Sequence, residues 1–470
     1  MKILLVADIF EYGAVNDSLA SFVQALLNNL KLLGYDIRLV IPEYKDSDLF
    51  KKEEDLYLDI PTLKTNFRAT RSCLDNIPVY LIKKMPSFEG CQIEELKDIV
   101  FFNRAVLSLL ESIDWKPDLI HCHNWQTALI PVYIKNNAND NSAFNNIATI
   151  LTIQTLEKQG TFAIEQYLQA TSSKYQDIYD QIIFKENINI LKGGIVCSDT
   201  ITVPSPTYSK EIQTKEYGLG LEDILSENSQ NLIGILNGLD YDLWNPENDK
   251  NLISNYSPSK LIDKRPNKEN LQRSLGLPVD LNIPVLAMDP YLKKQEGFNL
   301  INNTIDTILK LNIQFVAVIN MDSKYRSFFE ETQKKHPQKF AIFNKENSFI
   351  PAKLYAGVDI WGIPSLYDPC RNEQLINLRY GTIPIVKKTG SLNDIIVDYE
   401  KNKRSGNGFV FDDPEIFIDT VEKAISTFHE KTAWTKLMHR GMELRFSWEK
   451  TTKAYSKLYK RVINRKKKSF

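Results

Sequence analysis

The chain has 470 residues, a length that suggests two domains of roughly two hundred residues each. Hydrophobic residues make up 43% and charged residues 25% of the sequence, as in soluble globular proteins. The net charge of −1 excludes a broad basic field that would recruit nucleic acid, and no apolar run is long enough to cross a bilayer.

Cysteine usage and the first residues favour a cytoplasmic location. The five cysteines are odd in number and share no metal-ligand spacing, which fits a reducing compartment. Residues 1–7 are typical of a buried strand rather than a signal peptide, because Asp8 ends the apolar run. The basic residues near the end, at 460–461 and 465–468, favour a solvated helix end over a contact with an anionic partner.

The first half of the chain alternates short apolar strands with amphipathic helices. An opening strand, a helix that ends at Gly34 and a second strand predict a βαβ unit. Polar loops follow the later strands. We expect strands at 2–7, 35–42, 77–83, 148–154 and just after 117, and helices at 18–33 and 96–113.

The second half repeats this alternation after a break at residues 233–246, where an Asn-Gly turn and an Asn-Pro pair end both periodicities. In the last helix, which follows residue 447, Tyr455 and Tyr459 fall on one face. We expect helices at 267–276 and 373–380 and strands at 284–288, 316–320, 340–344, 358–363, 383–386 and 408–411.

Several ordered motifs resemble those of one enzyme family. His121-Cys-His-Asn-Trp-Gln126 is similar to His-x-His-Asp-Trp-Gln, and Leu236-Asn-Gly-Leu-Asp-Tyr241 with Trp244-Asn-Pro246 is close to a linker signature. Pro364-Ser-Leu-Tyr-Asp-Pro-Cys370 resembles Pro-Ser-Arg-Phe-Glu-Pro-Cys, and Phe446-Ser-Trp448 resembles a closing motif. The motifs that they resemble are those of the glycogen/starch synthases of the ADP-glucose type, glycosyltransferase family 5.

The resemblance covers essentially the whole chain and implies an α/β fold of the GT-B type. Two doubly wound, Rossmann-like domains would face each other across a cleft, and a C-terminal helix would cross back to the first domain. We therefore expect an acceptor-side domain at residues 1–240, a nucleotide-sugar-side domain at 241–445, and a crossover helix with a basic tail at 446–470.

The family's reaction needs charged groups that this chain lacks in its first half. Glucose transfer builds negative charge on the departing diphosphate, which fixed cations and backbone donors must stabilise. Where the family has a Lys-x-Gly-Gly loop, this chain has Val15 followed by Asn16 and Asp17. Asn124 replaces the Asp after the second His, and Gln154 replaces the His of Thr-x-His-Asn. We expect all three replacements to impair transfer.

The second half departs from the family in the same way. Tyr291 stands where the resemblance implies an Arg that holds the diphosphate, and Glu296 reverses the charge of the Lys five residues later. Asp368 replaces the donor-sugar Glu, and Arg371 replaces the Gly after Cys370. Lys293, Lys294 or Arg371 could substitute for a lost cation, which leaves a rearranged donor site open.

Some polar groups remain as candidates for binding a ligand. The resemblance and the turn chemistry point to Asn237, Asp368, Cys370, Thr389 and Gly390. No base lies near Cys370 in sequence, so we do not expect it to act as a nucleophile. His121 and His123 could ligate a metal, but packing at a strand end is the favoured alternative because no third ligand is near. We therefore expect no metal and no cofactor.

The sequence thus favours a synthase-like protein that has lost its chemistry. We expect a catalytically degenerate pseudo-glycosyltransferase of α-glucan metabolism that binds glycogen, a maltooligosaccharide or a partner protein such as an active glycogen synthase. ADP-glucose binding would be weak or absent, and neither nucleic acid nor a membrane would be a partner. The alternative is an active retaining α-1,4-glucosyltransferase that uses ADP-glucose or UDP-glucose with a rearranged donor site.

Overall fold

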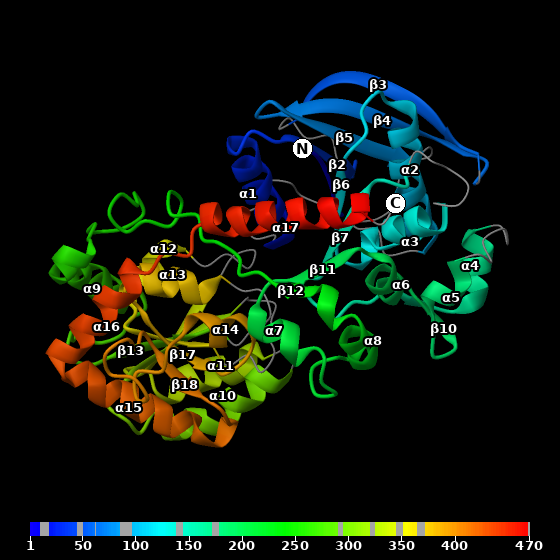
Figure 1. The fold of residues 1–470 in the computed structure, drawn as a ribbon. Coiled ribbons are helices and arrows are strands. Elements are labelled where there is room, and N and C mark those ends of the chain that lie inside the picture. The colour runs from blue at the N-terminus through cyan, green and yellow to red at the C-terminus, as the bar shows by residue number, and fades with distance from the viewer. Residues whose placement is uncertain are drawn as a thin grey trace. The chain divides into compact units, whose positions relative to one another are not determined.

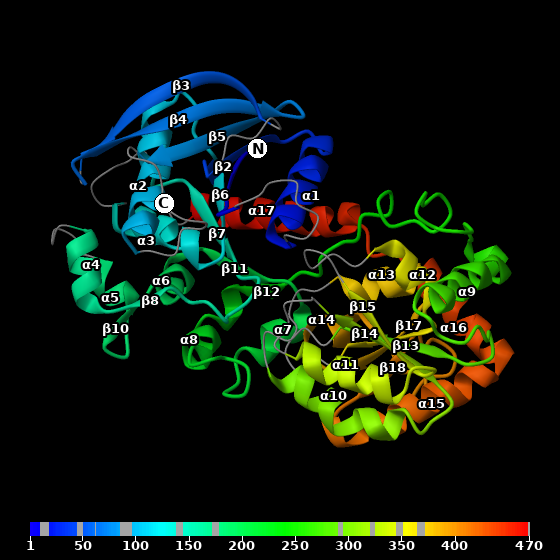
Figure 2. The same cartoon turned by 180° about the vertical axis from the view of Figure 1, so that it is seen from behind.

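The computed structural model describes residues 1–9, 18–44, 50–61, 63–84, 96–137, 144–171, 178–289, 295–319, 325–344, 351–363 and 372–468. The chain divides into two compact units (Figures 1 and 2). Unit 1 contains Met1–Leu236 together with Trp448–Phe470, and unit 2 contains Asn237–Ser447. The last helix therefore belongs to the same unit as the first half of the chain.

The described part of unit 1 forms a nine-stranded sheet in the order β12-β11-β7-β6-β1-β2-β5-β4-β3. The pairs from β12 to β5 are parallel, whereas β4 and β3 are antiparallel. Buried parallel strands need helices on both faces, which the alternating sequence provides. The strands are β1 (Lys2–Val6), β2 (Asp36–Pro42), β3 (Lys51–Ile60), β4 (Thr65–Leu74), β5 (Ile77–Lys84), β6 (Leu119–His123), β7 (Ala148–Thr152), β11 (Thr200–Val203) and β12 (Leu232–Gly234).

The helices of unit 1 cover this sheet and lead to a small second sheet. That second sheet has the order β8-β10-β9 and is antiparallel, with β8 at Thr161–Phe162, β9 at Ile183–Phe184 and β10 at Asn187–Asn189. The helices are α1 (Ser18–Leu32), α2 (Leu96–Ser112), α3 (Leu129–Asn137), α4 (Ile164–Ala170), α5 (Tyr179–Ile182), α6 (Ile190–Cys197), α7 (Pro206–Glu211), α8 (Glu222–Glu227) and α17 (Trp448–Lys468).

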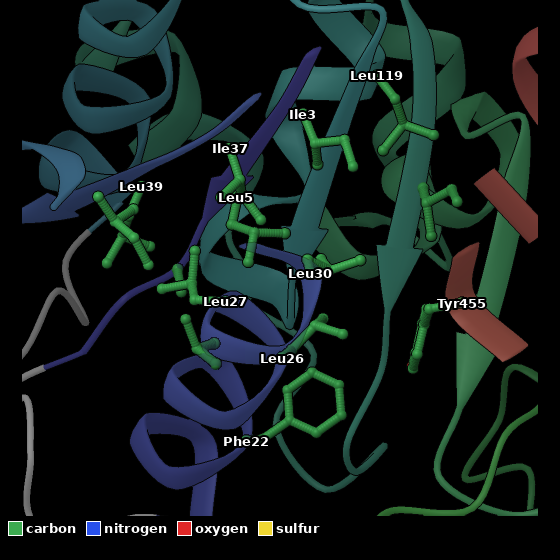
Figure 3. Close-up of a cluster of buried hydrophobic side chains, with 14 of the residues drawn as sticks. Ile3, Leu5, Phe22, Leu26, Leu27, Leu30, Ile37, Leu39, Leu119 and Tyr455 are labelled. Carbon is green, nitrogen blue, oxygen red and sulfur yellow. The ribbon is translucent and has the colours of Figure 1, made fainter. Parts of the chain in front are cut away.

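The predicted βαβ opening is confirmed, because β1 and β2 pair in parallel and α1 connects them in sequence. Figure 3 shows Leu26 and Leu30 of α1 beside Leu5 of β1, with Tyr455 of α17 in the same cluster. All four side chains are buried. Burial of apolar area supplies most of the free energy that holds the helix on the sheet.

Helix α17 docks through the face that its sequence predicted. Tyr455 and Tyr459 are both buried, and the hydroxyl of Thr451 donates to the carbonyl of Leu236 at 2.8 Å. At its basic end, Lys466 pairs with Asp199 at 3.2 Å, and most neighbouring cations are exposed. The exposed cations are compatible with the predicted solvated helix end, and the role of this basic end stays a prediction.

Strands β3 and β4 were missed from sequence. Strand β3 begins Lys51-Lys-Glu-Glu-Asp55, and its first five residues are all exposed. It lies at the edge of the sheet, where charged side chains discourage pairing with another chain. Only Leu56, Leu58 and Ile60 at the end of β3 alternate toward its buried side, so the polar first half carries none of the apolar alternation by which strands are recognised.

The described part of unit 2 is a six-stranded parallel sheet in the order β15-β14-β13-β16-β17-β18. Each of its strands lies within one residue or two of a predicted strand. The strands are β13 (Val285–Met288), β14 (Gln314–Ile319), β15 (Phe340–Asn344), β16 (Ile360–Ile363), β17 (Ile383–Lys387) and β18 (Phe409–Phe411).

Two of the helices of unit 2, α9 and α13, match predicted ones closely. The strand order places β13, β16 and β17 side by side, so their carboxyl ends meet at one edge of the sheet, where ligands bind in open α/β folds. The helices are α9 (Arg265–Ser274), α10 (Gln295–Ile308), α11 (Arg326–Lys335), α12 (Ala352–Gly357), α13 (Glu373–Arg379), α14 (Gly390–Ile395), α15 (Phe417–His429) and α16 (Lys431–Glu443).

The chain passes between the units at two points, and unit 2 ties these points together. The backbone N–H of Leu239 donates to the carbonyl of Phe446 at 2.7 Å, and Leu239 forms a bridge with Ser447. The hydroxyl of Tyr241 accepts from the N–H of Phe446 at 2.9 Å. The linker signature and the closing motif, far apart in sequence, therefore form one structural element.

None of the helices in the described ranges combines the length and the hydropathy needed to cross a bilayer.

Candidate functional site

The carboxyl ends of β6 and β7 bring Asn124 and Gln154 together. These strands pair in parallel, and Asn124 and Gln154 follow them directly. The side-chain oxygen of Asn124 accepts from the backbone N–H of Gln154 at 2.9 Å, and the N–H of Asn124 donates to the carbonyl of Thr152 at 2.8 Å. Two positions that the resemblance assigns to catalysis thus lie beside each other.

Asn124 adopts an unusual backbone conformation, with φ 59° and ψ −177°. This region is essentially reserved for glycine, and a residue held there stores about 1–3 kcal/mol of strain. Asn tolerates positive φ better than most residues because its short polar side chain can form local hydrogen bonds. The strained turn therefore lies at the position where the resemblance implies an Asp.

Two buried histidines of β6 lie beneath this turn. His121 Nδ1 lies 2.7 Å from the hydroxyl of Tyr459, and its Nε2 lies 2.6 Å from the hydroxyl of Thr152. Burial lowers the pKa of His121 well below its usual value, and the neighbouring His123 lowers it further. Burial also lowers the pKa of His123 to about 3. Both rings are therefore neutral at physiological pH.

His123 packs without finding a polar partner. Its ring lies edge-on to Phe22 at a centroid distance of 5.4 Å, and neither ring nitrogen has a hydrogen-bond partner among the described residues. Across those residues, no group of three or more His, Cys, Asp or Glu side chains is placed to hold a metal ion. The sequence left two roles for the histidine pair, metal ligation and packing at a strand end. The structure places both rings in packing contacts.

Gln154 presents a buried amide rather than an imidazole. The residue is 6% exposed, and its side-chain nitrogen has no hydrogen-bond partner within the described ranges. An unpaired buried donor costs about 1–3 kcal/mol. An amide can donate to a ligand oxygen, but it cannot exchange a proton near neutral pH.

The aromatic residues that follow β6 belong to the core. Trp125 is 6% exposed and Tyr133 is 1% exposed. A Cβ added at Gly160, where φ is +64°, would lie 2.2 Å from the Trp125 ring. The absence of a side chain at Gly160 therefore leaves room for the indole ring. Both aromatic residues are buried, so neither can stack against a sugar ring.

In unit 2, Thr389 and Gly390 follow the carboxyl end of β17 and begin α14. Thr389 is buried, and Gly390 has a φ of 47°, which glycine adopts without strain. Asn237, the first residue of unit 2, has a buried side-chain oxygen without a hydrogen-bond partner in the described parts of the chain.

Other predicted site residues lie outside the described residues. These are Val15, Tyr291, Asp368 and Cys370, and for Glu296 only the backbone, within α10, is described. Their roles stay predictions.

Arg379 of α13 is a candidate that we did not single out from sequence. It is 5% exposed, and its Nε donates to the carbonyl of Trp244 at 3.4 Å while Glu247 lies 3.7 Å from Nη2. Burial lowers its pKa, and the nearby Arg445 adds to this effect. Arg379 opens the run Arg379-Tyr-Gly381 at the end of α13. Because Arg379 contacts Trp244 and Glu247, we interpret it as a residue with a structural role.

Comparisons with known proteins identify relatives along the whole chain. Residues 2–227 match the family described as "Starch synthase catalytic domain". The chain is 36% identical to a glycogen synthase from Geotalea uraniireducens, over 99% of this chain and 100% of that protein. It is 35% identical to a glycogen synthase from Thermosipho melanesiensis, with the same coverage of both chains.

Solved structures show the same fold. The catalytic domain of starch synthase IV from Arabidopsis thaliana, bound to ADP and acarbose, matches 98% of this chain and 99% of its own with a TM-score of 0.83 and 27% identity. A sucrose-phosphate synthase from Thermosynechococcus elongatus shares the fold at 13% identity and a TM-score of 0.61, over 98% of this chain and 99% of its own. The chain therefore belongs to the glycogen/starch synthase family, and it has the GT-B fold of two parallel-sheet, Rossmann-like domains.

Proposed function

We propose that this protein of α-glucan metabolism has lost, or nearly lost, glucosyl transfer and acts by binding an α-glucan or a partner protein. Unit 1 would be the acceptor side and unit 2 the former nucleotide-sugar side. The proposal rests on what the chain places at the positions where the family keeps charged groups.

One observation carries the proposal: the residues that directly follow β6 and β7, up to Thr127 and Leu156, include no ionised side chain, and Glu157 and Lys158 are the first charged residues beyond Leu156. Residues 119–127 and 148–156, all of which the structure describes, contain only neutral residue types besides His121, Cys122 and His123. Burial lowers the pKa of both histidines and raises the pKa of Cys122, so all three are neutral at pH 7. Asn124 and Gln154 cannot supply the charge or the proton exchange of an Asp and a His.

The size of the effect is large. Removing one preorganised electrostatic contact costs about 3–4 kcal/mol of transition-state stabilisation. Each 1.4 kcal/mol is about tenfold in rate. The sequence has further replacements at Val15, Tyr291, Glu296 and Asp368, which we expect to lower the transfer rate as well. A carboxylate at residue 296 would repel a diphosphate. Such losses are not additive, yet two of them already lower the rate by several orders of magnitude.

A transfer assay tests the loss of chemistry. Purified protein is incubated with glycogen and either ADP-glucose or UDP-glucose, with an authentic glycogen synthase as the positive control. We expect no transfer above background and, by calorimetry, ADP-glucose binding far weaker than in the control. Turnover comparable to the control would refute the proposal and establish the active alternative. The observation on the side of that alternative is the 36% identity to a glycogen synthase along the whole chain.

A binding assay tests what remains. The related starch synthase IV was solved with acarbose, and a neutral saccharide is held by hydrogen bonds and ring faces that need no cations for a diphosphate. We expect co-sedimentation with glycogen at both low and high salt, because screening weakens charged contacts and not neutral ones. Absence of retention at either salt would exclude the glucan and leave a protein partner.

A further inference from the structure

Unit 2 contains a basic cavity between α16 and the turn that leads into β18. The cavity has a volume of about 810 Å³. Five of its lining residues are cations: Lys403, Arg404, Lys431, Lys436 and Arg440. Glu430 is the one carboxylate among the lining residues. The described surface of unit 2 thus holds a hollow whose charge is strongly unbalanced.

The frame of the cavity is fixed by backbone contacts. Arg440 Nη1 donates to the carbonyl of Gly406 at 3.0 Å, which ties α16 to the turn before β18. Tyr399, 8% exposed, forms part of the lining, and its N–H donates to the carbonyl of Gly408 at 2.8 Å. Lys403 lies 4.1 Å from the Tyr399 ring. These contacts order the backbone around the hollow, and the exposed side chains of Lys403, Arg404, Lys431 and Lys436 line it.

Few carboxylates neutralise these cations. Lys403 pairs with Glu400 at 2.5 Å, and the lining residue His439 lies 3.0 Å from Glu443. Arg404 and Lys436 are exposed at the rim. Lys431 lies 4.1 Å from the Phe428 ring; partial burial lowers its pKa, and the nearby Lys268 lowers it further. Like charges held around one hollow repel one another, and an anion in the hollow relieves that repulsion.

The cavity lies away from the positions that the family uses for the donor. Thr389 and Gly390 follow the carboxyl end of β17, whereas Gly406 and Gly408 precede β18 at its amino end. The strands are parallel, so these are opposite edges of one sheet. Figures 1 and 2 show α14 and α16 on opposite sides of the strands of unit 2.

We propose that this cavity binds a small molecule that carries phosphate-type oxyanions, at a site separate from any glucan or donor site. Its volume falls in the range of small-molecule pockets, about 300–1,000 Å³. Arginine forks and lysine point charges are the groups that bind phosphate oxygens in proteins. The inference does not depend on the proposed function, because it concerns another edge of unit 2.

Pyrophosphate and inorganic phosphate are the probes that test the site on the full chain. We expect pyrophosphate to bind more tightly than phosphate by calorimetry and to raise the melting temperature, since it presents more oxygens to the same cations. The double variant Arg404→Glu/Lys436→Glu should weaken pyrophosphate binding by roughly tenfold or more, about the loss of one charge-assisted contact. The variant Lys310→Glu, an exposed lysine outside the cavity, should bind as the unmodified chain does.

The unliganded variants separate binding from folding. Because Arg404 and Lys436 are exposed, the double variant should fold, and its melting temperature without ligand should be equal or higher, since repulsion is reduced. Pyrophosphate binding that is unchanged in the double variant would overturn the proposal and place the ligand elsewhere, including the family's donor side. Tight binding of a single-stranded oligonucleotide without any binding of pyrophosphate would also overturn it.

Discussion

The side-chain oxygen of Asn124 accepts the backbone N–H of Gln154 at 2.9 Å and joins the carboxyl ends of β6 and β7. An Asp could make the same bond with one carboxylate oxygen and keep its charge for a substrate. Asn preserves the bond without the charge. If the position carries an Asp in the family, as the resemblance implies, Asn124 keeps the hydrogen bond of that residue without its charge.

Replacement of Asn124 tests this separation. Asn124→Ala should lower the free energy of unfolding of unit 1 by about 1–3 kcal/mol, because it leaves the N–H of Gln154 unpaired at a strained turn. Asn124→Asp, the matched control, keeps the acceptor and should stay within about 1 kcal/mol of the unmodified chain. Urea unfolding and hydrogen exchange at Gln154 measure both. Equal destabilisation by the two variants would contradict the role of this bond.

The buried histidines should make unit 1 sensitive to acid. The unfolded chain binds protons at His123 below its ordinary pKa of 6.5, whereas burial lowers the folded pKa to about 3. Between these values the unfolded state holds more protons, so the free energy of unfolding falls as the pH falls. Each such histidine contributes a slope of about 1.4 kcal/mol per pH unit.

The variant His123→Leu removes one of these contributions. We expect similar stability near neutral pH, where the ring is neutral in both states, and a smaller loss of stability on acidification. Urea unfolding at about pH 7.5 and about pH 5 measures the difference. An unchanged slope would show that His123 is not held in its neutral form.

A buried ion pair should be essential to the stability of unit 2. Lys268 Nζ lies 2.6 Å from Asp359 Oδ2, and both side chains are at most 10% exposed. Asp359 Oδ2 also accepts the N–H of Val285 at 2.8 Å. Lys268→Met leaves the carboxylate buried without its cation and should cost about 3–5 kcal/mol.

Two further variants test whether the unpaired carboxylate causes the loss of stability in Lys268→Met. The double variant Lys268→Met/Asp359→Asn removes the charge as well and should recover part of the stability. Lys310→Met, at an exposed lysine, should change the free energy of unfolding by less than about 0.5 kcal/mol. A double variant that is less stable than Lys268→Met would exclude an uncompensated charge as the cause.

Repair of the donor side should improve binding more than catalysis. Tyr291→Arg with Glu296→Lys restores the two cations that the family pattern implies, so ADP-glucose should bind more tightly by calorimetry. Glucose transfer should remain poor, because Asn124, Gln154 and Val15 are unchanged. Robust turnover of the double variant would show that the losses in unit 1 matter less than we propose.

The sequence alone determined the alternation of strands and helices, because apolar periodicity is a local property of the chain. It located β1, α1 and β2, and it placed Tyr455 and Tyr459 on the buried face of α17. The motifs also indicated the family correctly, since long ordered matches are independent of how the chain packs. Strand β3 was missed because its first five residues are polar and exposed and show no such periodicity.

Only the tertiary structure decided which distant residues meet. The bond between Leu239 and Phe446 and the joining of Arg404 with Lys436 around one hollow both link segments that no local pattern connects. The neutral state of His123 likewise follows from burial by its neighbours, not from its residue type. Local sequence fixes backbone preference over a few residues, whereas burial and electrostatic environment depend on packing across the whole unit.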